Sequence, residues 1–367
     1  MGHNADAATG AISFINIDPL VVLALLSLGF LGGMLSGFIG SGGAFVLTPG
    51  MINLGVPGPV AVASNMCHKF PKALVGAWKR KKLGHVDVKL GLIMAVSAIA
   101  GVRVGVGVQN AILEAWGTAG SNLYISLAFV LVLTTVGYTM LRDVRKSMRL
   151  GADDSTSRLA QRIASLNIPP MIHFRTAGAR TTLWATVPLG FATGMLAATI
   201  AVGGFIGVPA MIYVIGAPAF VASGTELVIA FCMGLEGTYE WAMHGFVDLR
   251  LTLLILAGSL IGVQIGALGT SYVKQYMIKF VTAVVMLFAA LSRAFMVPVY
   301  LSGVGVLSVD EAMSGLLSLL SSGVLYGTLV CAGILIVIAM IKGKRAAEAA
   351  REAGIRPEVS TTPELIR

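Results

Sequence analysis

The sequence predicts an all-α polytopic membrane protein, built from two inverted repeats with broken or re-entrant helices. Of the 367 residues, 56% are hydrophobic and only 12% are charged, a composition that excludes ordinary water-soluble folds. The apolar stretches are continuous rather than alternating, which favours membrane-spanning helices over an outer-membrane barrel. The third observation is an internal repeat at one constant offset in the sequence.

Seven apolar stretches are long enough for full spans, because crossing about 30 Å of hydrocarbon takes about 20 helical residues. Two short helical hairpins are expected in addition to these spans. No Lys or Arg occurs in the first nineteen residues, so we expect the first span to be retained rather than cleaved as a signal peptide. The predicted full spans are 20–40, 86–106, 123–141, 183–203, 249–269, 276–297 and 316–341.

The charge distribution predicts the orientation of the chain in a bacterial inner membrane. Residues 142–182 hold eight Lys or Arg against three Asp, and residues 79–82 and the 342–351 segment are also basic. Cytoplasmic loops carry such an excess, so the N-terminus is expected outside and the C-terminus inside. The formal charge of +9 has the same explanation, and no nucleic-acid partner is predicted. The segments expected outside carry no Lys or Arg: 1–19, a loop at 108–122, and a loop at 298–315.

A shift of 161 residues superposes the two halves of the sequence. The pairs include Gly29 with Gly190, Gly33 with Gly194, Gly55 and Pro57 with Gly216 and Pro218, Asp87 with Asp248, and Gly101 with Gly262. Since one copy would enter the membrane from outside and the other from the cytoplasm, the repeats are expected to be inverted, as in many secondary transporters. The expected divisions are an outer segment at 1–19, repeat 1 at 20–141, a basic cytoplasmic loop at 142–182, repeat 2 at 183–297, an outer loop with an extra C-terminal span at 298–341, and a cytoplasmic tail at 342–367.

Each repeat interrupts its first span at a glycine cluster, at 40–43 and at 202–204. The segments that follow, 44–54 and 205–215, are too short to cross a bilayer, so each is expected to form a re-entrant hairpin with the next helix. Broken helices at membrane depth offer free N–H groups and positive dipole ends to anions. The alternative is that these glycines serve close helix packing. The candidate anion ligands at the two breaks are Gly42, Gly43, Gly203 and Gly204.

Polar side chains lie at equivalent positions in the helices that follow. Ser64 and Asn65 correspond to Thr225 and Glu226 under the same shift. Hydroxyl and amide groups donate hydrogen bonds to oxyanions, so Ser64, Asn65 and Thr225 are predicted substrate ligands. A carboxylate within a membrane span is costly unless it is functional or paired. We therefore expect Glu226 either to carry a coupling proton or to pair with a cation, Lys69 or Arg103.

Four basic residues of repeat 1 correspond to uncharged residues in repeat 2: His68, Lys69, Lys72 and Arg103. Lys69 is the preferred substrate-binding cation, whereas Lys72 is expected to extend toward the basic cluster at 79–82. Arg103 is interpreted as a buried structural charge or a vestibule charge rather than a direct ligand. Glu236 and Glu240 are expected to line an outer vestibule.

Several chemical motifs are absent from the sequence. There is no nucleotide-binding glycine loop ending in Gly-Lys-Ser or Gly-Lys-Thr, and no paired His/Glu metal motif, so neither a cofactor nor a metal is predicted. Cys67, Cys232 and Cys331 lack the spacing of a metal site or a disulfide framework. No catalytic nucleophile and base are recognisable, so an enzyme is not expected. The energy for transport is then expected from a coupling proton, another ion or solute gradient, or a partner.

The glycine-rich first helix resembles that of the sulfite exporter TauE/SafE family. The resemblance covers residues 20–297 and implies a bacterial inner-membrane carrier tied to sulfite, sulfoacetate or other sulfur compounds. It is carried by the run from Gly29 to Gly43, by Pro49, by the turn Gly55, Val56 and Pro57, by Ala61 to Ser64, and by a second copy from Gly190 through Gly204 to Pro218.

The preferred hypothesis is therefore a secondary transporter of a small anion, such as a sulfur oxyanion or an organosulfonate, that works by alternating access in a lipid bilayer. One alternative is a carrier of a cation or a neutral solute that uses Glu226. A different class is a membrane enzyme or scaffold, for which His68, Glu226 and Glu240 are the available chemical groups.

Overall fold

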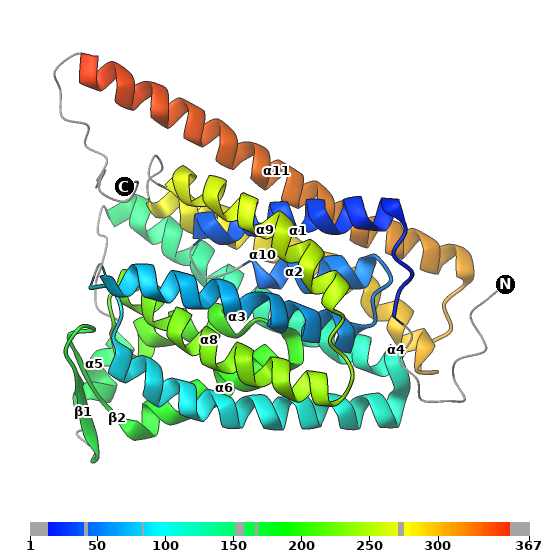
Figure 1. Ribbon diagram of the computed structural model, residues 1–367, viewed down its shortest axis with the longest axis horizontal. Coiled ribbons are helices and arrows are strands. Elements are labelled where there is room, and N and C mark those ends of the chain that lie inside the picture. The colour runs from blue at the N-terminus through cyan, green and yellow to red at the C-terminus, as the bar shows by residue number, and fades with distance from the viewer. Residues whose placement is uncertain are drawn as a thin grey trace.

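A computed structural model describes residues 14–39, 43–82, 84–150, 158–165, 168–270 and 275–352. The described chain is mainly helical, and most of the helices lie side by side along the long axis of the molecule (Figure 1). Seven helices are long and apolar enough to cross a membrane. The predicted fold class, an all-α polytopic membrane protein, is confirmed. These seven helices are α1, α4, α6, α8, α9, α10 and α11.

The first half of the chain forms four helices. They are α1 (Pro19–Ile39), α2 (Ala44–Asn53), α3 (Gly58–Lys82) and α4 (Val88–Leu150). Helix α4 contains both predicted spans at 86–106 and 123–141 and kinks at Gly117, where φ is 63°. The predicted outer loop at 108–122 is therefore wrong. Hydropathy falls there, but helical hydrogen bonding continues except at the one glycine that adopts a left-handed conformation.

The basic segment 142–182, predicted as a loop, contains regular structure. It includes the end of α4, the helix α5 (Arg158–Ser165), and an antiparallel hairpin of β1 (Met171–Phe174) and β2 (Ala179–Thr182). The Asp87 carboxylate accepts hydrogen bonds from the N–H groups of Thr176 and Ala177, both at 3.0 Å. The hairpin turn is thereby tied to the start of α4.

The second half of the chain repeats the pattern of a long helix, a short helix and two long helices. It forms α6 (Leu183–Ile200), α7 (Gly203–Ala210) with a π-helical continuation η2 (Met211–Ile215), α8 (Ala219–Met243) and α9 (Leu249–Thr270). Two further helices follow, α10 (Gln275–Gly303) and α11 (Glu311–Glu352), so the predicted outer loop at 298–315 is confined to 304–310.

The helices that follow the two short ones are longer than the predicted hairpins require. Helices α3 and α8 have 25 residues each, which corresponds to about 37 Å at ~1.5 Å per residue. Helix α8 is also apolar enough to span, although it was expected only as a hairpin arm. Within the described residues, the short apolar helices are therefore α2 and α7 with η2.

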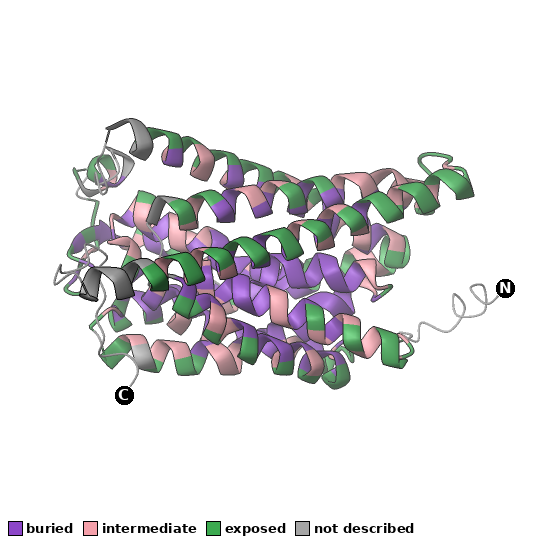
Figure 2. Cartoon of the chain, turned by 90° about the horizontal axis from the view of Figure 1, so that it is seen from above, coloured by how far each residue is buried: buried purple, intermediate pink, exposed green. Residues whose placement is uncertain are grey.

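The buried residues occupy the centre of the helix bundle, and exposed residues cover its outside (Figure 2). Many large apolar side chains are nevertheless exposed, such as Leu20 at 75%, Leu131 at 70% and Leu319 at 72%. Apolar side chains spread over the outside of long helices are expected where lipid tails replace water.

Close helix pairs meet through glycines. A Cβ at Gly101 of α4 would overlap the carbonyl oxygen of Phe191 in α6, and a Cβ at Gly262 of α9 would overlap that of Phe30 in α1. Adding 161 to Gly101 gives Gly262, and subtracting 161 from Phe191 gives Phe30, so the two contacts are equivalent under the repeat. Gly194 with Ala98 and Gly33 with Ser259 are related in the same way. In both pairs, α1 with α9 and α4 with α6, the two helices run parallel.

Helices α3 and α8 pack against each other in antiparallel directions. Gly76 of α3 lies against Leu227 of α8, and Gly237 of α8 lies against Met66 of α3. The shift of 161 residues converts one of these contacts into the other. The 161-residue relation therefore exchanges α3 with α8 and maps the contact between them onto itself.

Candidate functional site

The two short helices begin side by side inside the bundle. Helix α2 starts after Gly43 and α7 starts after Val202, and neither of these N-cap residues makes a side-chain cap hydrogen bond. The rings of Phe45 and Phe205, the second helical residue of α2 and the third of α7, lie 4.4 Å apart between centroids at 74°. Two helix starts without a cap from their N-cap side chains therefore lie next to each other.

The structure places three of the four candidate glycines at these helix starts, while Gly42 lies outside the described residues. A Cβ at Gly43 would overlap the carbonyl oxygen of Gly32 in α1. A Cβ at Gly203 would come within 2.9 Å of the side chains of Ala197 and Met233 and of the Thr193 carbonyl oxygen. Close packing therefore accounts for the small size of Gly43 and Gly203, as the alternative interpretation proposed. Gly204 lines a cavity instead.

Ser64 and Thr225 each accept a hydrogen bond from the other half of the chain. The Asp248 N–H at the start of α9 donates to Ser64 Oγ at 3.2 Å, and the Asp87 N–H at the start of α4 donates to Thr225 Oγ1 at 2.9 Å. The two bonds correspond under the 161-residue shift. Both hydroxyl groups are fully buried, and each hydrogen bond joins the middle of one repeat to a helix start of the other repeat.

Asn65 binds the beginning of α2. Its Nδ2 group donates to the Ala44 carbonyl oxygen at 2.9 Å and to Thr48 Oγ1 at 2.8 Å. Its Oδ1 atom is buried and has no hydrogen-bond partner among the described residues. Asn65 therefore fixes the position of α2 and still presents an unpaired acceptor.

Glu226, the counterpart of Asn65, lies against α7. A Cβ at Gly207 would overlap its Oε2 atom, and both of its carboxylate oxygens are buried with no hydrogen-bond partner among the described residues. Lys69 of α3 is the cation whose charge acts on it, although no ion pair joins the two in the described part of the chain. Lys69 is itself only 9% exposed. The structure thus places a buried lysine on α3 and a buried acid against Gly207 of α7.

Arg103 is not the partner of Glu226. Its guanidinium Nε lies 2.6 Å from Glu236 and 3.4 Å from Glu240, both on α8. The interpretation of Arg103 as buried is wrong, because its side chain is 62% exposed. These three residues form one charged cluster on the side of the bundle.

The neighbours of Lys69 on α3 are held by other helices. Lys72 Nζ donates to Ser36 Oγ of α1 at 3.4 Å, and His68 Nε2 lies 2.9 Å from Ser259 Oγ of α9. Lys72 therefore points to α1 rather than only toward the basic cluster at 79–82. Among the described residues, no group of three or more His, Cys, Asp or Glu side chains comes together.

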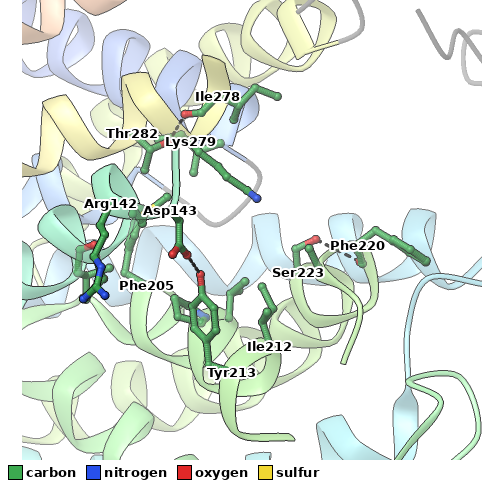
Figure 3. Close-up of a pocket in the computed structure, with 18 of the residues that line it drawn as sticks. Arg142, Asp143, Phe205, Ile212, Tyr213, Phe220, Ser223, Ile278, Lys279 and Thr282 are labelled. Carbon is green, nitrogen blue, oxygen red and sulfur yellow. Dashed lines mark hydrogen bonds between the residues drawn. The ribbon is translucent and has the colours of Figure 1, made fainter. Parts of the chain in front are cut away.

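A cavity of about 1140 Å³ reaches the start of α7 (Figure 3). Sequence reasoning assigned its basic residues only to membrane orientation, or did not single them out at all. The sequence feature that could have indicated this cavity is the presence of several Lys and Arg residues at the ends of separate spans. These residues become neighbours only when the helices pack together. The charged residues of its lining are Arg80, Arg142, Asp143, Arg145, Lys146 and Lys279.

Arg293 was also missed. It is fully buried on α10, and its Nη2 donates to the Asn53 side chain and, at 3.0 Å, to Ser321 Oγ of α11. Tyr326 of α11 donates to the Gly50 carbonyl oxygen at 2.9 Å. The last helix is thereby joined to the end of α2, and a positive charge at that end is favourable for the helix dipole.

The chain was compared with known proteins. The family model described as Sulfite exporter TauE/SafE matches residues 25–293. The "Probable membrane transporter protein YdhB" of Bacillus subtilis is 25% identical over 263 residues, which cover 71% of this chain and 93% of that protein. A "Probable membrane transporter protein" of Xylella fastidiosa is 24% identical over 271 residues, 71% of this chain and 88% of the relative. No solved structure matches. Because the family model spans well over half of the sequence, this chain belongs to the sulfite exporter TauE/SafE family of membrane transporters.

Proposed function

We propose that the protein is a secondary transporter of a small anion, a sulfur oxyanion or organosulfonate of the sulfite or sulfoacetate type. The observation that carries the proposal is the pair of helix starts at α2 and α7, which lie together inside the bundle and whose N-cap residues, Gly43 and Val202, provide no side-chain cap. Helix N-termini favour anions because their N–H groups are free and their dipole ends are positive. The buried Lys69 adds a full positive charge nearby.

Alternating access in this proposal depends on inverted repeats. A two-fold rotation that maps the antiparallel contact of α3 and α8 onto itself has its axis perpendicular to these helices. If the helices run across the bilayer, that axis lies in the membrane plane, which is the inverted arrangement. The paired contacts of Gly101 and Gly262 support the same relation. The repeats would comprise residues 20–141 and 183–297, as the sequence suggests.

The proposed orientation puts the N-terminus outside and the C-terminus in the cytoplasm of a bacterium. The strands β1 and β2, helix α5 and the end of α11 lie at one end of the bundle, and the start of α1 and the turn between α10 and α11 lie at the other (Figure 1). The first end carries the basic segments and the second end the segments without Lys or Arg. The positive-inside rule therefore supports this orientation.

The proposed ligands are the N–H groups of residues near Gly42, Gly43, Gly203 and Gly204, and the side chains of Ser64, Asn65, Lys69 and Thr225. The hydroxyl oxygens of Ser64 and Thr225 act as acceptors for backbone N–H groups, so their own protons remain available for an oxyanion. Glu226 is proposed as the coupling-proton carrier, because its buried carboxylate has no hydrogen-bond partner among the described residues.

Binding to a lysine variant tests this proposal. We expect Lys69→Met to weaken equilibrium binding of sulfoacetate by about tenfold to hundredfold, the range for losing a hydrogen bond to a charged group. Lys72→Met is the matched control on the same helix, since Lys72 is bonded to Ser36, and a smaller loss is expected there. Unchanged or tighter binding in Lys69→Met would favour the alternative of a cation or neutral-solute carrier that uses Glu226.

A further inference from the structure

The cavity beside α7 connects a basic surface to the proposed anion site. Its inner wall includes Gly204 and Phe205 at the start of α7, and other parts of the wall come from α4, α8 and α10. Five Lys or Arg residues line it, against one acidic residue, Asp143, among the described lining residues. A cavity with such an excess of one charge, bounded by protein of low dielectric constant, concentrates ions of the opposite sign.

Two of the cations lie deeper than the rest. Arg80 is half-buried at the end of α3, and its Nη1 donates to Ser223 Oγ of α8 at 2.6 Å. Lys279 of α10 is also half-buried, and its side chain is part of the cavity wall (Figure 3). These two charges come from different helices. Arg142, Arg145 and Lys146 are exposed and form the outer rim.

The single acidic residue of the lining is held by a tyrosine. The Tyr213 hydroxyl donates a hydrogen bond to Asp143 Oδ2, as Figure 3 shows. Tyr213 lies in η2, the π-helical continuation of α7, and Asp143 lies in the second arm of α4. A hydrogen bond to a carboxylate fixes its direction and disperses its charge. Asp143 is thus less able to repel an anion or to bind the neighbouring cations.

We propose that this cavity is a cytoplasmic binding vestibule for soluble oxyanions and that Tyr213 sets its affinity by masking the charge of Asp143. The ligand class is a small organic or inorganic anion that carries a sulfonate, sulfite or similar oxygen-rich group. The inference rests on the proposed function, because that proposal makes the cargo an anion. It adds a second binding region that contains Arg80 and Lys279, and it gives Asp143 and Tyr213 a role in setting the affinity of this region.

The test measures equilibrium binding of sulfoacetate to the full chain in nanodiscs of uncharged phosphatidylcholine. We expect Asp143→Asn to tighten binding by about threefold to tenfold, the effect of one unit charge at ~8 Å in a partly aqueous site. We expect Tyr213→Phe to weaken binding by a smaller factor, because the hydroxyl group offsets only part of the charge of Asp143. The double variant should match Asp143→Asn, because the tyrosine has no effect once the charge is removed. Raising the salt concentration should reduce all of these differences.

A mechanical role for the same hydrogen bond gives a different pattern. If the bond only latched η2 to α4, Tyr213→Phe would break it, whereas Asp143→Asn would keep it, because the amide oxygen of asparagine can still accept from the Tyr213 hydroxyl. Weaker binding in Tyr213→Phe together with unchanged binding in Asp143→Asn would therefore overturn the masking role. Tyr138→Phe, an exposed tyrosine on α4 outside the lining, is the matched control and should leave binding unchanged.

Two further outcomes complete the test. Adding phosphatidylglycerol to the nanodiscs should change sulfoacetate affinity little, and a large loss would assign these cations to lipid head groups and overturn the proposal. A wild-type protein that binds and moves no anion would contradict the proposed function itself. Anion binding by the wild type with no effect of Tyr213→Phe or Asp143→Asn would contradict only the vestibule.

Discussion

Glu226 is the residue that we propose as the carrier of the coupling proton. Both of its carboxylate oxygens are buried without hydrogen-bond partners among the described residues, and its side chain lies against Gly207 of the short helix α7. A carboxylate within a membrane span is costly unless it is functional or paired, which supports this role for Glu226.

We predict that Glu226→Gln, which resembles the protonated acid, loses uptake driven by a pH gradient but keeps sulfoacetate binding and equilibrium exchange. The measurement is uptake into proteoliposomes with and without a pH gradient. Glu114→Gln, an exposed acid on α4, is the control and should behave as the wild type. Full pH-driven uptake in Glu226→Gln would remove this residue from the coupling step, and loss of binding would assign it to the cargo or the structure.

Sequence reasoning found the equivalence of Ser64 with Thr225 but not their contacts. Their hydrogen bonds join residues 184 and 138 positions apart, to the N–H groups of Asp248 and Asp87. Such distant pairings depend on how the helices are placed, which hydropathy and residue spacing do not report. Arg293 was missed for a related reason, because its neutral partners lie on α2 and α11 and leave no charge pattern in the sequence.

The helix contacts formed by glycine allow a matched test of the packing. Gly101 and Gly262 occupy equivalent contacts, in which a Cβ would overlap a backbone carbonyl oxygen of the facing helix. We predict that Gly101→Ala and Gly262→Ala each destabilise the protein by about 1–3 kcal/mol, the usual range for overpacking, and lower the melting temperature by several degrees in detergent.

Gly107 provides the control for these two substitutions. It lies on α4 near Gly101, but nothing within 4 Å would meet its Cβ, so Gly107→Ala should be neutral or slightly stabilising. Melting temperatures that are equal in all three variants would show that the close helix contacts at Gly101 and Gly262 are not formed.

The helices were predicted more successfully than the connections between them. Long apolar stretches specify spans, and the glycine clusters at 40–43 and 202–204 correctly marked the breaks before α2 and α7. The prediction failed at 108–122 because a helix that leaves the bilayer loses its hydropathy signal but keeps its hydrogen bonds. It also gave no sign of α5 or of the hairpin, whose strands have only four residues each.

The orientation of the whole chain is tested by labelling single cysteines. In a variant without Cys67, Cys232 and Cys331, we expect a cysteine at Ser165 of α5 to react from the cytoplasmic side and one at Ser308 to react from outside. Both serines are exposed, so reagent access is limited by the membrane and not by burial. Reaction of both positions from the same side would contradict the proposed topology and the inverted repeats that depend on it.

The asymmetry of the molecule lies outside its repeated contacts. Lys69 and Glu226 have no charged counterparts. Of the two short helices in the described part of the chain, α2 is the one bonded to Arg293 and α11, and α7 is the one that lines the cavity with Tyr213. The short helix α7 is thus the one that faces an open basic cavity, while α2 is fixed by α3 and α11. We therefore expect the region around α7 and η2 to undergo the larger movement during transport.

Anion flux through the purified protein is the most direct test of function. Proteoliposomes are loaded in parallel with sulfite, sulfoacetate, thiosulfate and sulfate, and release is compared with that from empty liposomes. We expect saturable release of at least one sulfur anion, and its loss in Gly204→Val, because a branched side chain at the start of α7 blocks close approach to the backbone N–H groups. Release of none of these anions, or normal release from a stably inserted Gly204→Val variant, would contradict anion transport at the two helix starts.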